Sequence, residues 1–83
     1  MLFVCGCDHD PVTGILSVSF CSPSKERRAV REYRDVDPLL HRRMLAARPH
    51  WQRVLEQEIA PTHAVRRRGE SEWHEPHGRE SAA

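Results

Sequence analysis

The sequence predicts an α+β fold in which an N-terminal β-hairpin packs on two helices, in ββαα order. Three observations lead to this fold: two short apolar runs flank a turn-forming stretch, a middle segment has helical spacing and cap signals, and a longer segment repeats that spacing. At 83 residues the chain has room for one small domain. We assign that domain to residues 1–60 and a flexible polar tail to residues 61–83.

The hairpin is predicted from residues 2–7 and 15–21, which are rich in β-branched, aromatic and small apolar side chains. The stretch between them, DHDPVTG, supplies aspartates, a proline and a glycine, the residues that favour a turn. Pairing Cys7 opposite Ile15 separates the side chains into a semi-polar face, with Cys5 and Cys7, and an apolar face. The apolar face contains Leu2, Val4, Leu16, Val18 and Phe20. Because an isolated hairpin is marginally stable in water, we expect a helix to cover this face.

The first helix is predicted to begin near residue 23 or 25, where serines can cap it, and to end between residues 35 and 38. Its apolar side and its basic side are adjacent. The apolar side contains Ala29, Val30, Tyr33 and Val36, and the basic side contains Arg27, Arg31 and Arg34.

The second helical segment, residues 38–60, begins with an Asp37 cap and with Pro38 in the first turn. An apolar stripe with steps of three and four residues runs through it and past Pro49. An interior proline costs about 3 kcal/mol, so the helix either kinks or splits there. Because the stripe keeps its phase across Pro49, we expect one kinked helix.

Positive charge is concentrated in residues 25–53, which contain nine basic and four acidic side chains. We expect the exposed arginines to contact a partner, and the open edges of the hairpin to pair with a larger protein or with a second copy. The sequence thus predicts a small non-enzymatic accessory or regulatory protein that acts by protein–protein contact. Nucleic-acid binding through the same basic residues is the alternative. The predicted contact residues are Arg27, Arg28, Arg31, Arg34, Arg42 and Arg43.

Cys5, Cys7 and His9 occupy alternate positions and would lie on one side of the first strand, where a soft metal such as zinc could find ligands. The only other cysteine lies at the far end of the hairpin, so we predict no metal or cofactor. A metal- or thiol-redox protein is the second alternative. An enzyme is not predicted, because about 60 folded residues leave little volume for a pocket.

The N-terminus shows no basic leader, no cleavage site and no apolar run long enough to span a membrane. We therefore expect a cytoplasmic protein with reduced thiols and no membrane partner. In residues 61–83 charge, histidine and glycine outnumber the larger apolar side chains, which predicts the flexible tail.

Overall fold

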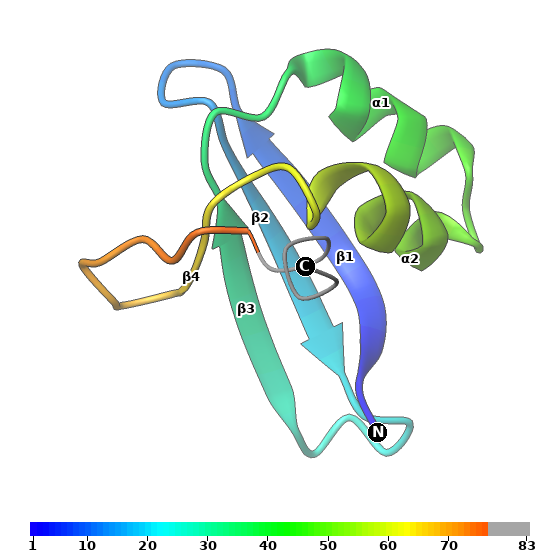
Figure 1. Cartoon of the computed structure of the whole chain (residues 1–83). Helices are drawn as coiled ribbons and strands as arrows, with labels where there is room; N and C mark the ends of the chain where they lie inside the picture. Colours follow the sequence, from blue (N-terminus) through cyan, green and yellow to red (C-terminus); the bar gives the residue numbers. More distant parts are fainter. Residues whose placement is uncertain (77–83) are drawn as a thin grey trace, which may run out of the picture.

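Four antiparallel strands form a single sheet, in the order β1-β2-β3-β4, in the computed structural model of the protein, which describes residues 1–76 (Figure 1). The helices follow the third strand and pack on one face of the sheet. This confirms the α+β class and an N-terminal hairpin packed on two helices, although both helices come from the segment 38–60. The elements are β1 (Phe3–Asp10), β2 (Ile15–Cys21), β3 (Arg28–Tyr33), α1 (Pro38–Ala46), α2 (Trp51–Val54), the π-helical turn η1 (Leu55–Ile59) and β4 (Val65–Arg67).

The turn of the hairpin is shorter than the sequence predicts, because β1 continues to Asp10. The Asp10 carboxylate accepts the backbone N–H of Val12 at 2.9 Å, and the Gly14 N–H donates to the Asp10 carbonyl at 2.8 Å. Gly14 has φ of +76°, a conformation that glycine adopts without strain. These are the turn residues that the sequence indicates, in a tighter arrangement.

The predicted register of the hairpin is wrong: Cys7 lies opposite Val18, and Asp10 lies opposite Ile15. A β-bulge between Val4 and Gly6 inserts one extra residue into β1 and changes which side chains share a face. Val4 remains on the apolar face, as predicted, but it lies opposite Phe20 and not opposite Val18. Beyond the bulge, however, Cys7 and His9 join that apolar face, because they lie opposite Val18 and Leu16.

A turn, and not a helix, occupies the residues that follow β2. The Ser22 hydroxyl accepts the Arg27 N–H at 3.2 Å, and the Ser24 hydroxyl accepts the Glu26 N–H at 3.4 Å. Lys25 adopts a positive φ of 65°, which an α-helix does not allow. The serines therefore satisfy the backbone of a β-turn with the same hydrogen bonds that would cap a helix.

The prediction of a first helix within residues 23–36 is therefore wrong, since β3 is the third strand of the sheet. Ala29 and Tyr33 are four residues apart, which fits one face of a helix, but Ala29, Arg31 and Tyr33 also alternate as one face of a strand. In the structure they lie opposite Phe20, Val18 and Leu16 of β2. The Arg31 guanidinium stacks over the Phe20 ring at 5.1 Å, so this face accommodates an arginine among apolar residues.

The segment at 38–60 is split at Pro49, where we expected one kinked helix. The Asp37 carboxylate accepts the Leu39 N–H at 2.9 Å and caps α1 as predicted. Residues 47–50 form turns, and α2 starts again at Trp51. The apolar stripe nevertheless faces the sheet on both sides of the break, since Met44 and Ile59 are both fully buried.

The core lies between these helices and the sheet. Leu16 and Val18 of β2 are fully buried against Met44 and Ile59, as the alternation in β2 and the stripe in residues 38–60 predict. The other buried members are Val4, Phe20, Tyr33, Val36 and Leu55, and Leu40 and Trp51 pack against the cluster. This arrangement confirms that the apolar face of β2 meets the second helical segment.

Residues 61–76, which the sequence predicts as the first part of a flexible tail, include strand β4. The Arg66 guanidinium donates to the Glu32 carboxylate at 2.8 Å, and Val65 forms an isolated bridge with His74. The Trp73 ring lies under two guanidiniums, those of Arg66 at 4.2 Å and Arg34 at 5.2 Å. Ion pairs and cation–π contacts hold this strand in place, and few apolar side chains contribute to its packing. The remaining predicted tail, residues 77–83, lies outside the described residues.

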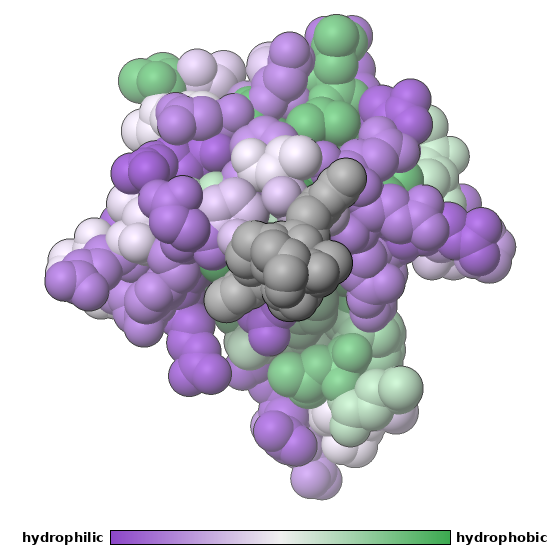
Figure 2. Space-filling view, in the orientation of Figure 1, coloured by the Kyte–Doolittle hydropathy of each residue, from purple (hydrophilic) through white to green (hydrophobic). Residues whose placement is uncertain are grey.

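The helices cover only part of their face of the sheet. They contact β1 and lie on its side of the molecule, while β3 and β4 lie on the other side (Figure 1). Apolar surface is therefore visible over the lower end of β2 and β3, surrounded by hydrophilic side chains (Figure 2).

Candidate anion-binding groove

Three of the six predicted contact arginines meet in one groove. Arg27, Arg28 and Arg31 line a depression of about 530 Å³ at the edge of β3. None of the three makes an ion pair with another of residues 1–76. The prediction that these arginines are exposed is confirmed, but a strand and a turn, and not a helix, present them to solvent.

Two further arginines, Arg67 and Arg68, complete the groove from β4 and the turn after it. We call the depression lined by these five arginines the arginine groove. Its other lining residues are aliphatic: Leu2, Ala29 and Val30. The groove thus combines five positive charges with an apolar surface, and no acidic side chain among residues 1–76 lines it.

The arginine groove follows an edge of the sheet that β4 leaves partly open. β4 pairs with Arg31–Tyr33, and the Arg68 N–H donates to the Val30 carbonyl at 3.0 Å. Among residues 1–76, no strand pairs with β3 on this side before Val30. Consecutive residues of β3 line the groove, so side chains from both faces of the sheet border it.

The other predicted contact arginines lie elsewhere. Arg34 stacks on Trp73, and Arg42 and Arg43 are exposed on α1. The Arg43 guanidinium donates to the Glu58 carboxylate at 2.7 Å, and this hydrogen bond raises the pKa of Arg43. The structure therefore divides the predicted set into a groove and separate surface positions.

The sequence contains a signal for the two missed arginines, the run Arg66–Arg67–Arg68, which we assigned to the tail. One arginine of this run forms an ion pair with β3, and the other two line the groove. Arg66 bonds to Glu32, while Arg67 and Arg68 border the groove. Only the antiparallel register of β3 and β4 brings this run beside Arg31, and no local pattern in the sequence indicates that register.

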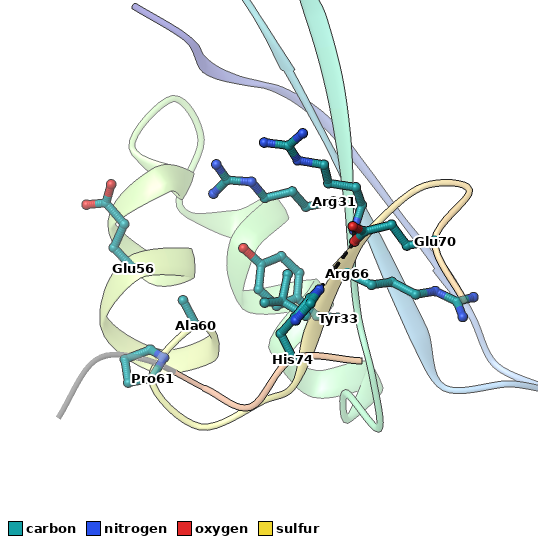
Figure 3. Close-up of a pocket in the computed structure, with 10 residues that line it drawn as sticks. Arg31, Tyr33, Glu56, Ala60, Pro61, Arg66, Glu70 and His74 are labelled. Atoms are coloured by element: carbon teal, nitrogen blue, oxygen red, sulfur yellow. Dashed lines mark hydrogen bonds and ion pairs between the residues drawn. The ribbon is translucent and has the colours of Figure 1, made fainter. Parts of the chain in front are cut away.

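A second cavity, also about 530 Å³, lies beside the groove, between η1 and the β3–β4 pair (Figure 3). Arg31 and Arg67 line both spaces. Tyr33 lies in its wall, and burial raises the pKa of the Tyr33 hydroxyl, which Arg31 partly offsets. Both cavities fall within the size range of ordinary ligand sites, although we expected so short a chain to leave little volume for a pocket.

The structure does not bring Cys5, Cys7 and His9 together, as the metal alternative requires. Cys7 and His9 lie on the face that the helices cover, whereas Cys5 is in the bulge and exposed. The His9 ring bonds to the Val36 carbonyl through Nε2 at 2.8 Å and stacks on His41. Within the described part of the chain, no three metal-ligating side chains come close enough to hold an ion.

The hairpin edges have different surroundings from those that the sequence predicts. β3 covers the outer side of β2, so of the two hairpin strands only β1 lies at a sheet edge. The Val4 N–H of β1 donates to the Gln52 side chain at 3.3 Å, and the exposed Asp8 and Asp10 add negative charge to this strand. The arginine groove, at the opposite side of the sheet, is therefore the better candidate for contact with an anionic partner.

Comparison with family models, with curated proteins and with solved structures finds no match to this chain. No helix among residues 1–76 has the length and apolar character needed to cross a bilayer. The site itself defines the protein as a small α+β fold with a cationic groove at a partly open sheet edge.

Proposed function

We propose that this chain is a small non-enzymatic accessory protein that binds an extended, acidic segment of a larger protein in the arginine groove. The observation that carries this proposal is the composition of the groove lining, with five arginines, three aliphatic residues and no carboxylate. Guanidinium groups bind carboxylates through paired hydrogen bonds. The aliphatic residues give apolar side chains of the same segment a surface to cover.

The open edge of β3 supports an extended conformation for the bound segment. A peptide that adds to a sheet edge gains backbone hydrogen bonds, while its alternate side chains point to opposite faces. The groove has arginines on both faces of the strand, since Arg28 and Arg31 are an odd number of positions apart. Acidic side chains on both sides of an extended segment would thus each find a guanidinium.

The groove is less suited to nucleic acid, the alternative that the sequence leaves open. Binding of single strands commonly uses aromatic side chains on which bases stack. No aromatic side chain of the described residues lines the groove, and the Trp73 ring already makes cation–π contacts with Arg34 and Arg66. Phosphate contacts alone would give binding that depends steeply on salt concentration.

A direct test measures fluorescence anisotropy of a labelled peptide that repeats Glu-Glu-Val-Val, which places glutamates on both sides of an extended segment. A peptide with lysine in place of glutamate, a single-stranded oligonucleotide and a short duplex serve as competing probes. We expect the acidic peptide to bind wild type, and Arg28→Glu to weaken binding by about tenfold or more, since it reverses one groove charge. Arg42→Glu is the matched control, because it makes the same charge change on α1, outside the groove.

Amide hydrogen exchange shows whether the peptide uses the sheet edge. The peptide should slow exchange in residues 27–30 and leave the β1 edge unchanged. Equal loss of binding in Arg42→Glu, or binding of the oligonucleotides without binding of the peptide, refutes the proposal. If only the oligonucleotides bind, and their binding depends steeply on salt concentration, the result supports the nucleic-acid alternative instead.

A further inference from the structure

The cavity between η1 and the β3–β4 pair contains an unusual pair of like charges. Arg31 and Arg67 lie directly opposite each other in the β3–β4 register, so their side chains project from the same face of the sheet. Like charges in this position destabilise a sheet. Neither guanidinium makes an ion pair with another of residues 1–76; the Phe20 ring near Arg31 and the Glu70 carboxylate near Arg67 offset part of their repulsion.

An anion between the two guanidiniums would remove this repulsion and gain charge-assisted hydrogen bonds. Arg31 is held in place from below, because its guanidinium stacks over the Phe20 ring at 5.1 Å. Arg67 is held through its backbone, because its N–H donates to the Glu70 carboxylate at 2.8 Å. The Arg31 guanidinium and the Arg67 backbone thus have fixed positions on the rim of one cavity.

The rest of the cavity is apolar at its base and acidic at its sides. Tyr33, Ala60 and Val65 supply the apolar surface, and Tyr33 itself is only 3% exposed. Figure 3 shows Glu56 at one side of the cavity and Glu70 at the other, where Glu70 pairs with His74. Two carboxylates at the sides disfavour a ligand with several negative charges, such as a phosphate, and tolerate a single carboxylate.

We propose that this cavity binds a small monocarboxylic acid with an apolar body. The carboxylate lies between Arg31 and Arg67, and the body covers Tyr33 and Val65. A volume of about 530 Å³ is ample for such a molecule. This site shares Arg31 and Arg67 with the arginine groove, but Glu56, Ala60 and His74 line only the cavity and Arg28 lines only the groove.

Phenylpropionate is a suitable probe, with its uncharged amide and inorganic phosphate as comparison ligands. Titration followed by two-dimensional NMR should shift the backbone signals of Ala60 and Val65 for phenylpropionate and not for the amide. Arg67→Gln should weaken binding by about tenfold or more, because it removes one of the two guanidiniums. Ala60→Met, which fills the cavity without a change of charge, should weaken binding as well.

Two controls separate a binding role from a structural one. Arg67→Gln should leave the melting temperature of the ligand-free protein unchanged or raise it, since the variant removes a like-charge pair. Arg28→Glu should bind phenylpropionate as wild type does, because Arg28 lines only the groove, and this separates failure here from failure of the peptide proposal. Equal binding of the amide, stronger binding of phosphate, or unchanged binding in Arg67→Gln overturns the inference.

Discussion

The ion pair between Glu32 and Arg66 provides a measure of how firmly β4 belongs to the sheet. The Arg66 Nε donates to the Glu32 carboxylate at 2.8 Å, and the two side chains are 23% and 15% exposed. A charge-assisted hydrogen bond with this little exposure contributes more than a surface pair, and we expect a coupling energy of about 1–2 kcal/mol. Arg68, at 3.8 Å from the same carboxylate, is 62% exposed and should add little.

A double-mutant cycle isolates this coupling from other effects of each substitution. Glu32→Gln, Arg66→Met and the double variant would be unfolded in urea and followed by circular dichroism, with tryptophan fluorescence as a second probe. The pair formed by Arg43 and Glu58 is a useful control, because its 2.7 Å distance is shorter but its side chains are 60% and 34% exposed.

We expect the control pair to show clearly weaker coupling, because solvent screens an exposed pair whatever its distance. A coupling below about 0.5 kcal/mol for Glu32 and Arg66 would contradict the reasoning, because that is the range of exposed surface pairs. The stretch that contains β4 would then behave as the flexible tail that the sequence predicts.

Three further predictions concern the core, an exposed carboxylate and a thiol. Met44→Ala, at a fully buried position, should lower the free energy of unfolding by about 2–5 kcal/mol, whereas Leu39→Ala, at a side chain 58% exposed, should change it by less than about 1 kcal/mol in urea denaturation. The backbone N–H of Arg67, at the end of β4, lowers the pKa of Glu70, so the stabilisation is present above the ordinary pKa and is lost as pH falls through the lowered one; Glu70→Gln should flatten the acid side of the stability–pH curve. A hydrogen bond with the Cys21 thiol raises the pKa of Cys5, so Cys21→Ala should lower it and speed alkylation of Cys5 by iodoacetamide near neutral pH, in a variant whose other β1 cysteine is serine. Unchanged rates would contradict the last of these.

Strong periodicity made part of the fold predictable. The alternation of Leu16, Val18 and Phe20 gives one buried face, and the stripe through Met44 covers it, as the sequence predicts. Asp37 caps its helix because its carboxylate accepts a free backbone N–H of the first turn, and Pro38 fits the first helical position. In these segments local preference and tertiary packing agree, so the sequence alone was enough.

The third strand could not be predicted because its pattern fits two periods. Ala29 and Tyr33 satisfy helical spacing as well as strand alternation, and the serines before them can cap a helix or close a turn. The deciding factor is not local: the edge of β2 has unpaired backbone groups, and a strand satisfies them whereas a helix does not. The predicted register of the hairpin was wrong for a related reason: one bulge at Cys5 changes the pairing of every later residue of β1.

The candidate site depends on pairing between distant parts of the chain, which explains why its sequence signal was incomplete. Arg27, Arg28 and Arg31 are conspicuous in the sequence, but their meaning depends on a strand edge that only β4 defines. Arg67 lies in a run of arginines that resembles a solvated tail until the register places it opposite Arg31. Two guanidiniums without an ion-pair partner on one face of a sheet lower its stability. Such a pair is of use to the protein only if the cavity binds a ligand there. This local cost, at the point where the groove and the cavity meet, is why we propose anion recognition at the β3–β4 pair and not at Arg42 and Arg43 on α1.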